Sequence, residues 1–323
     1  MTLDVWIFAL ICFPYVVEVS ATKQYGKKSM FKPARENSKK LTHFEDLGIS
    51  KWNKHLNKIM STNDTEKSNE ISDDLDAKIV NGREAEEGEF PWMVALHYNG
   101  RFICSSFLIS PTIVMTAAHC VQFEDSVEPA TAFYGIIGNI RRSGPETRID
   151  FSEVAAHPEY GTGSEYDIAV FRTTQPVEMS ETISTICLPT AGRKFEFEPV
   201  RAMGWGVTST ESREPPEILM TTEMTVEPTS LCQAFFAISM ITITDRHVCV
   251  TSFRATGVCF GDSGGPLVYE DPESGRPLAI GVASFVTILG CGRPLVPSVY
   301  TATSGYIDWL NETVVDTSDI CFV

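Results

Sequence analysis

The chain has 323 residues, of which 43% are hydrophobic and 21% charged, and its formal net charge at pH 7 is −16. This length accommodates one large domain or two ordinary ones, and the apolar fraction is large enough for a sizeable core. The excess of acidic residues argues against the basic surface that nucleic-acid binding requires, so we expect no nucleic-acid partner.

The N-terminal residues have the pattern of a secretory signal peptide. An apolar run over residues 5–17 precedes the small-residue cleavage pattern Val19-Ser20-Ala21. Asp4 stands where a positive charge is usual, and Pro14 interrupts the run. A membrane anchor is the alternative, but it needs about 20 apolar residues. We therefore expect a signal peptide over residues 1–21 and a secreted, extracellular protein with no stable membrane anchor.

The cysteines also indicate an oxidising compartment. Of the nine cysteines, Cys12 would leave with the signal peptide, and the remaining eight are an even number compatible with four disulfides. In a secreted chain, Asn63 and Asn311 begin Asn-x-Thr sequons and become candidate glycosylation sites.

Residues 22–78 are polar and free of cysteine, and we interpret them as a flexible segment rather than a domain. Residues 22–60 carry a net charge of +7 and residues 61–78 one of −4, whereas the chain from Ile79 onward carries −17. Long-range attraction could hold the basic part loosely on the acidic body. A solubilising tail that does not dock fits the same charges equally well.

The composition changes at Ile79, where short apolar runs begin to alternate with turn residues. This pattern is typical of an antiparallel all-β protein. The clearest runs are residues 102–104, 107–109, 113–115 and 168–171. Ile307, Leu310 and Val314 have helical spacing after Ser304 and predict a short C-terminal helix. The six histidines are scattered and no Cys-x-x-Cys occurs, so we expect no metal and no cofactor.

The stretch Gly257–Leu267 combines a serine, an aspartate and four glycines. A serine between glycines, such as Ser263, can sit on a tight turn with its hydroxyl exposed beside backbone N–H groups. Upstream, His119 follows one predicted strand and Asp167 directly precedes another. Each of these residues alone would be an ordinary surface or core residue. Together they supply a base, an acid and a nucleophile, which indicates nucleophilic catalysis.

On these residues the chain resembles the chymotrypsin-like (trypsin-fold) serine proteases from residue 79 to about residue 314. The matching motifs are Ile-Val-Asn-Gly at 79–82, Pro91-Trp92, Thr-Ala-Ala-His-Cys at 116–120, Asp-Ile-Ala-Val at 167–170, Gly204-Trp205-Gly206 and Gly-Asp-Ser-Gly-Gly-Pro-Leu at 261–267. The resemblance implies an all-β fold of two packed six-stranded antiparallel β-barrels with a short C-terminal helix. It also implies a propeptide over residues 22–78 and a protease domain over residues 79–323.

The resemblance assigns a role to each candidate residue. His119 would act as the base, Asp167 would orient its imidazole, and Ser263 would attack a peptide carbonyl. Backbone N–H groups of Gly261 and Ser263 would bind the oxyanion. We therefore expect a monomeric serine endopeptidase that acts on polypeptide substrates. The alternative is a non-catalytic protease homologue that serves as a binding or cofactor protein.

The family also has a characteristic activation step, in which proteolysis creates an N-terminus that folds inward. This N-terminus pairs with the aspartate that precedes the nucleophile. The matching residues are Ile79 and Asp262, with cleavage after Lys78. A buried carboxylate needs a partner, and the ammonium group of Ile79 exists only after the cut. We therefore expect a secreted zymogen.

The pocket for the residue before the cleaved bond, P1, differs from that of trypsin-like members. Gly257 stands where those members have an aspartate, so basic P1 residues are not expected. The residues that would line the pocket are Gly257, Val258, Ser284, Phe285, Val286 and Ser298. The motifs around them look like those of elastases, which favours small or medium aliphatic P1 residues. A chymotrypsin-like preference for Phe or Leu is the alternative, and an acidic preference through Arg293 is a third hypothesis.

The expected pocket bears on activation and on partners. An enzyme that prefers aliphatic P1 residues would cut poorly after Lys78. We therefore expect an upstream trypsin-like protease as the activator. Protein protease inhibitors are further candidate partners.

Family spacing implies three disulfides, Cys104–Cys120, Cys232–Cys249 and Cys259–Cys291. Cys187 and Cys321 remain, and an oxidising compartment favours a bond between them over free thiols. The chain departs from the family at Ser105 and Ser106, where two glycines are usual. On the leaving-group side of the cleft, these hydroxyls would alter the substrate subsite.

Overall fold

The computed structural model describes residues 82–323 apart from 124–125, 145–146, 162–163, 208–213, 238, 240, 254–255 and 288–290. The chain divides into two compact units, 1–42 and 43–323, and every described residue belongs to the second. The expected signal peptide, the propeptide with Asn63, and the activation residues Lys78 and Ile79 lie outside the described residues.

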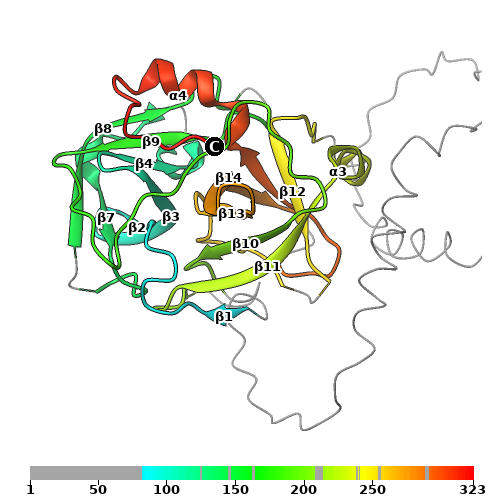
Figure 1. The fold of residues 1–323 in the computed structure, drawn as a ribbon, viewed down its shortest axis with the longest axis horizontal. Helices are drawn as coiled ribbons and strands as arrows, with labels where there is room; N and C mark the ends of the chain where they lie inside the picture. The colour runs from blue at the N-terminus through cyan, green and yellow to red at the C-terminus, as the bar shows by residue number, and fades with distance from the viewer. Residues whose placement is uncertain are drawn as a thin grey trace, which may run out of the picture. The chain divides into compact units, whose positions relative to one another are not determined.

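Six antiparallel strands close into a first barrel in the order β2-β3-β4-β9-β8-β7 (Figure 1). Their bounds are β2 Met93–Tyr98, β3 Arg101–Ser110, β4 Ile113–Thr116, β7 Phe133–Ile137, β8 Thr147–Ala156 and β9 Ala169–Thr173. Alternate apolar side chains fill the interior. There the rings of Phe151 and Phe171 stack with centroids 4.3 Å apart, and the ring of Phe133 lies 5.2 Å from that of Phe171.

A second barrel follows in the chain. Its strands are β10 Pro199–Gly204, β11 Met220–Glu227, β12 His247–Thr251, β13 Pro266–Asp271, β14 Arg276–Val286 and β15 Ser298–Ala302. The order is β11-β10-β13-β14-β15-β12, and pairing of β12 with β11 closes the ring. The short strand β1, Arg83–Glu84, pairs with β11 from outside. The expected fold of two six-stranded antiparallel barrels is confirmed.

Two short α-helices accompany the barrels. The helix α4, Ile307–Thr313, is the predicted C-terminal helix, and it buries Leu310 against the first barrel (Figure 1). The helix α3, Thr229–Phe236, was not expected from the sequence. It has eight residues and buries only Cys232 and Phe236, which is too little for a helical period to stand out.

Short elements complete the described part of the chain. They are the hairpin of β5 Gln122–Phe123 and β6 Ser126–Val127, and the 3₁₀-helices η1 Ala118–Cys120, η2 Ala130–Ala132 and η3 Thr303–Gly305. At the C-terminus, the Leu188 N–H donates to the carbonyl oxygen of Cys321 at 2.8 Å, and the Val323 N–H donates to that of Leu188 at 2.9 Å. The tail is therefore tied to the segment that joins the two barrels.

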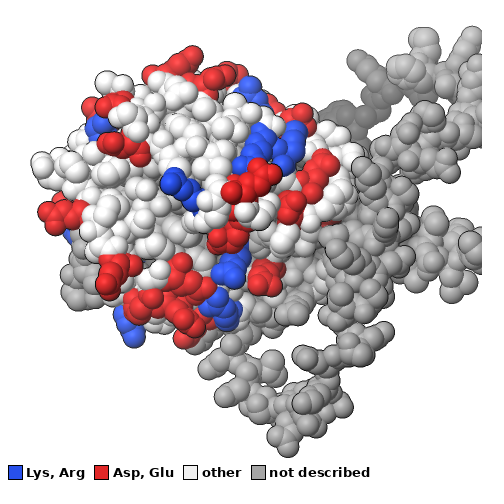
Figure 2. Space-filling view, in the orientation of Figure 1, with Lys and Arg blue, Asp and Glu red and all other residues white. Residues whose placement is uncertain are grey.

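The surface carries both signs of charge. Figure 2 shows acidic side chains in several separate groups on one face, with basic side chains between them. Within the part of the chain that the structure describes, no helix combines the length and the apolar character needed to cross a bilayer.

Candidate active site

His119 and Asp167 are brought together by strand pairing in the first barrel. His119 lies in η1 directly after β4, and Asp167 lies just before β9, which pairs with β4. Oδ2 of Asp167 is 2.8 Å from Nδ1 of His119, and Oδ1 accepts a 3.0 Å hydrogen bond from the His119 backbone N–H. The carboxylate therefore holds both the ring and the backbone of His119. Because Nδ1 donates to the carboxylate, Nε2 is left as the basic nitrogen.

Three contacts from other elements fix Asp167 itself. The preceding residue, Tyr166, adopts a left-handed φ of 67° and donates its N–H to the hydroxyl of Tyr306 at 2.9 Å. Thr301 Oγ1 donates to the Asp167 carbonyl oxygen at 2.9 Å, and Ser284 Oγ donates to Oδ2 at 2.5 Å. The sequence indicated Ser284 only as a pocket wall. No motif in the sequence predicts the contact between Ser284 and Asp167, because the two residues are 117 positions apart.

The electrostatics of the pair favour an ionised Asp167 and a basic His119. Burial raises the pKa of Asp167, but attraction to His119 and hydrogen bonds from His119 and Ser284 outweigh it, so this pKa lies below its usual value. Burial lowers the pKa of His119, but the Asp167 carboxylate outweighs it, so this pKa lies above its usual value. The side chain of His119 is 30% exposed and that of Asp167 only 8%. The pair can therefore accept a proton from a group that approaches Nε2.

Ser263 lies half-buried in the turn before β13, between two glycines in the left-handed region. Gly261 has a φ of 102° and Gly264 one of 78°, which other residues rarely adopt. Gly264 also lies very close to the residues that lead into His119, because an added Cβ would be 2.1 Å from Thr116 Oγ1. The Ser263 turn and the His119 segment are thus in direct contact.

Ser105 and Ser106 differ from the expectation, because both are fully buried. Ser106 Oγ donates to the Val94 carbonyl oxygen at 3.0 Å, so it ends in the barrel wall. Ser105 Oγ donates to the carbonyl oxygen of Gly261 at 3.2 Å, and its backbone N–H donates to that of Ser263 at 2.9 Å. Neither hydroxyl forms a surface subsite. Ser105 instead supports the Ser263 turn at two carbonyl groups.

Asp262 points away from solvent into a space formed by two glycines. Its oxygens accept hydrogen bonds from the N–H groups of Gly206 at 2.7 Å and Cys259 at 2.8 Å. An added Cβ at Gly204 would lie 2.2 Å from Oδ1, so only glycine fits beside the carboxylate. Burial raises the pKa of Asp262 to about 6 in spite of the two hydrogen bonds. No ion pair joins it to any other described residue.

Most of the expected pocket residues also come together. Val286 in β14 pairs with Ser298 in β15, and an added Cβ on Gly257 would lie 3.9 Å from Ser298 Oγ. Val258 is buried in the same apolar cluster against which Val286 packs. Phe285 differs from them, because its ring packs against Phe236 of α3 with centroids 5.9 Å apart.

The structure contains the four expected disulfides, Cys104–Cys120, Cys187–Cys321, Cys232–Cys249 and Cys259–Cys291. The side chains of Cys104, His119 and Cys120 lie close enough to resemble a metal site. The two sulfurs are bonded to each other, however, so neither can act as a thiolate ligand. The candidate glycosylation residue Asn311 is exposed on α4.

Two closed antiparallel barrels, with an Asp167–His119 pair whose carboxylate is buried, are the arrangement of a chymotrypsin-like serine protease. A sequence profile of the family described as Trypsin matches residues 79–310, and the chain belongs to this family.

Similar proteins include Transmembrane protease serine 9 of Rattus norvegicus, 34% identical over 73% of this chain and 22% of its own length. The Suppressor of tumorigenicity 14 protein homolog of Bos taurus is 33% identical over 74% of this chain and 28% of its own length. The Clotting factor G beta subunit of Tachypleus tridentatus is 32% identical over 73% of this chain and 79% of its own length. The chain thus matches only about a quarter of the first two relatives.

Proposed function

We propose that the chain is a serine endopeptidase whose catalytic residues are Ser263, His119 and Asp167. The observation that carries this proposal is the double contact of the Asp167 carboxylate with the ring and the backbone of His119. Such a contact fixes the tautomer in which Nε2 is unprotonated. The close packing of Gly264 on the His119 segment supports Ser263 as the group that Nε2 serves.

In the proposed reaction, Ser263 Oγ attacks the carbonyl carbon of the scissile peptide bond while its proton passes to His119 Nε2. The C–N bond then breaks, and the same proton passes to the departing amine. This leaves the acyl group of the substrate bonded to Ser263 Oγ. A water molecule then attacks the acyl carbonyl carbon while its proton passes to His119 Nε2. The bond to Ser263 Oγ breaks, the carboxylic acid product leaves, and the proton passes to Ser263 Oγ to restore the hydroxyl. Asp167 stays ionised throughout and stabilises the imidazolium form of His119.

The oxyanion formed in each addition step would be bound by the backbone N–H groups of Gly261 and Ser263. The left-handed φ of Gly261 and the hydrogen bond from Ser105 to its carbonyl oxygen support this role, since both fix the orientation of the peptide groups in the turn. Loss of one such donor typically costs about 3 kcal/mol of transition-state stabilisation.

The environment of Asp262 supports activation by proteolysis. A buried carboxylate whose pKa is raised to about 6 is a site for a cation, and cleavage of the Lys78–Ile79 bond would create one at Ile79. We propose that the ammonium group of Ile79 then pairs with Asp262 and orders the Ser263 turn. The predicted secretion of the chain, its release from the propeptide and its activation by a trypsin-like protease belong to the same proposal.

For substrates, we propose small or medium aliphatic P1 residues. Gly257 supplies no charge, and the apolar contacts of Val258 and Val286 support an apolar pocket of limited width. Such discrimination is graded, since one methylene in an apolar pocket is worth about 1–3 kcal/mol. A chymotrypsin-like preference for Phe or Leu is the second candidate, favoured by the absence of a side chain at Gly257. The exposed position of Arg293 gives no support for an acidic preference.

A serine-directed phosphonate probe tests the reaction. The chain cut after Lys78 should be labelled at Ser263, whereas the uncut chain and a Ser263→Ala variant should not. An unlabelled cut chain would favour the alternative of a binding or cofactor protein. A peptide library varied at P1 then decides the pocket, and strong cleavage after Lys or Arg would refute the aliphatic assignment.

A further inference from the structure

A cavity of about 620 Å³ is lined mostly by residues of the first barrel, with Pro215 from the segment between β10 and β11. Its lining includes no acidic residue but three arginines, although the chain as a whole carries 42 acidic against 26 basic residues. The arginines are Arg101, Arg142 and Arg148, and the floor between them is aromatic and apolar. A concentration of cations in one hollow of an acidic protein calls for an explanation.

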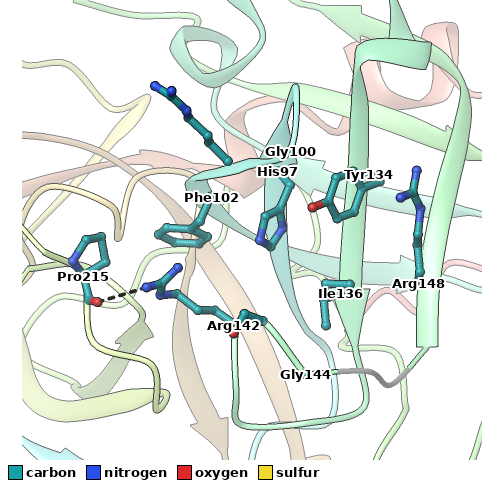
Figure 3. A pocket seen from close by; sticks show the side chains of 11 residues that line it. His97, Gly100, Phe102, Tyr134, Ile136, Arg142, Gly144, Arg148 and Pro215 are labelled. Atoms are coloured by element: carbon teal, nitrogen blue, oxygen red, sulfur yellow. Dashed lines mark hydrogen bonds between the residues drawn. The ribbon is translucent and has the colours of Figure 1, made fainter.

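The side chains of this hollow form an ordered row, shown in Figure 3. The guanidinium carbon of Arg142 lies 5.5 Å from the centroid of the Phe102 ring. The His97 ring follows with its centroid 5.9 Å from that of Phe102, and the Tyr134 ring stacks on His97 at 4.7 Å. The guanidinium carbon of Arg148 ends the row, 4.1 Å above Tyr134. We call these five side chains the cation–aromatic row.

Each guanidinium group packs on one ring, Arg142 on Phe102 and Arg148 on Tyr134, which restricts its motion, so less entropy would be lost when it binds a carboxylate. Burial lowers the pKa of His97, which is 5% exposed and whose Nδ1 lies 3.1 Å from the Ala95 carbonyl oxygen. His97 is therefore a neutral spacer. The positive charge of the hollow comes from its arginines alone.

The arginines at the two ends of the row already have acidic neighbours behind the hollow. Arg148 donates to Asp150 Oδ1 at 2.8 Å, in a pair whose two side chains are more than half exposed. Arg142 Nε is 3.7 Å from a Glu217 carboxylate oxygen. An exposed pair such as Arg148–Asp150 contributes at most about 1 kcal/mol, so a ligand carboxylate can compete with it. Arg142 is 25% exposed and also donates to the carbonyl oxygens of Pro216 at 3.0 Å and Pro215 at 3.3 Å, which hold its guanidinium group in place at the hollow. Arg101 is exposed and forms no ion pair with another described residue.

One end of the row also reaches the candidate active site. Phe102 Cε1 would lie 3.4 Å from a Cβ added to Gly261, the expected oxyanion residue. The P1 pocket near Gly257 and Val286 belongs to the second barrel, whereas Phe102 belongs to β3 of the first. When the P1 residue of a substrate occupies the pocket and the cleaved bond lies at Ser263, the residues that follow this bond therefore extend toward β3.

We propose that the cation–aromatic row binds an acidic stretch of the polypeptide substrate C-terminal to the cleaved bond. This inference rests on the proposed endopeptidase function and adds a substrate class to it. The four distances between neighbouring groups of the row add up to less than the length of about seven extended residues, at about 3.3 Å per residue. An extended peptide of that length can therefore reach both ends of the row. Carboxylates a few residues apart would meet Arg142 and Arg148 at the two ends of the row and Arg101, which lines the same hollow. An apolar side chain between them would lie on Phe102 and Tyr134.

The test compares two internally quenched peptides with the same residues before the cleaved bond. In one peptide the third to eighth residues after the bond include Asp and Glu, and in the other these are Asn and Gln. A p-nitroanilide with no residue after the bond measures the catalytic centre alone. Three forms of the chain cut after Lys78 are compared. They are the unchanged chain, the double variant Arg101→Gln with Arg148→Gln, and the single variant Arg172→Gln. Arg172 is the matched control, since it pairs with the exposed Glu153 on the same barrel but outside the hollow.

We expect kcat/KM to be about fivefold to tenfold higher for the acidic peptide at low salt, since two or three exposed ion pairs supply this range. The ratio should fall toward one at high salt and in the double variant, and it should persist in Arg172→Gln. If the enzyme hydrolyses the anilide but cleaves the acidic and the neutral peptide at equal rates, this proposal is wrong and the proposed endopeptidase function still stands. No hydrolysis of any substrate would overturn both. Binding of the acidic peptide to Ser263→Ala, measured by fluorescence anisotropy, should show the same dependence on Arg101 and Arg148.

Discussion

Cleavage after Lys78 should change the way in which the stability of the protein depends on pH. In the folded chain the pKa of Asp262 is about 6, against an ordinary value of 3.8. A difference of about two pKa units corresponds to roughly 3 kcal/mol. The folded state binds the Asp262 proton more tightly than the unfolded state does. The resulting contribution to the free energy of unfolding is therefore fully present below pH 3.8. It is lost as the pH rises from there through about 6.

After cleavage, the ammonium group of Ile79 would favour the ionised form of Asp262, so its pKa should fall and this loss should disappear. The assay is urea denaturation of Ser263→Ala protein, cut and uncut, at several pH values between 4 and 7.5. Other groups, including Asp167 and His119, contribute equally to both forms. The difference between the two curves therefore reports on Asp262 together with the new α-amino group of Ile79, which stays mostly protonated below pH 7.5 because its ordinary pKa is about 7.7–8.0.

An Asp262→Asn variant provides the control, because its cut and uncut forms should have parallel pH profiles. The expected result is that the free energy of unfolding of the uncut chain falls by roughly 3 kcal/mol, relative to the cut chain, across the window. Identical profiles for cut and uncut Ser263→Ala protein would show that Ile79 does not reach Asp262. The activation proposal would then be wrong.

Three variants give further tests. Ser284→Ala removes a charge-assisted hydrogen bond to Asp167. The value of kcat/KM on a short peptide should therefore fall about tenfold, and the acidic limb of its pH profile should move to higher pH; an unchanged pH profile would show that Ser284 is only a pocket wall. Val286→Gly should widen the pocket and raise the ratio of kcat/KM for Phe over Val at P1 about tenfold, whereas an unchanged ratio would place the restriction elsewhere. Replacing Cys187 and Cys321 together by Ser should lower the free energy of unfolding by about 2–5 kcal/mol in urea titrations, with activity on a short peptide retained; unaltered stability would contradict the role of this long loop.

The catalytic candidates could be predicted from the sequence because each has a local signature. His119, Asp167 and Ser263 stand in short motifs with small neighbours, and the barrels follow from short alternating runs. The glycines around Ser263 also announce positive φ angles, which the structure contains at Gly261 and Gly264. Features of this kind depend on a few consecutive residues, so their spacing is visible in the chain.

Other features depend on contacts between distant segments and have no local signature. The cation–aromatic row arises because β2 and β7 pair with His97 opposite Tyr134, a register that neither strand shows alone. The burial of Ser105 was missed for a similar reason, since a strand pattern does not tell which face meets the second barrel. Motifs thus locate chemistry, whereas strand register and burial decide which neighbours surround it.

The disulfide between Cys187 and Cys321 has a topological consequence. It closes a covalent ring over 134 positions, and this ring contains every strand from β10 to β15 together with Ser263. His119 and Asp167 lie outside the ring. A single cut in any loop of the second barrel would open the ring without releasing a fragment. Under non-reducing conditions, a nicked molecule would keep its proposed nucleophile covalently attached to the barrel that carries its proposed base.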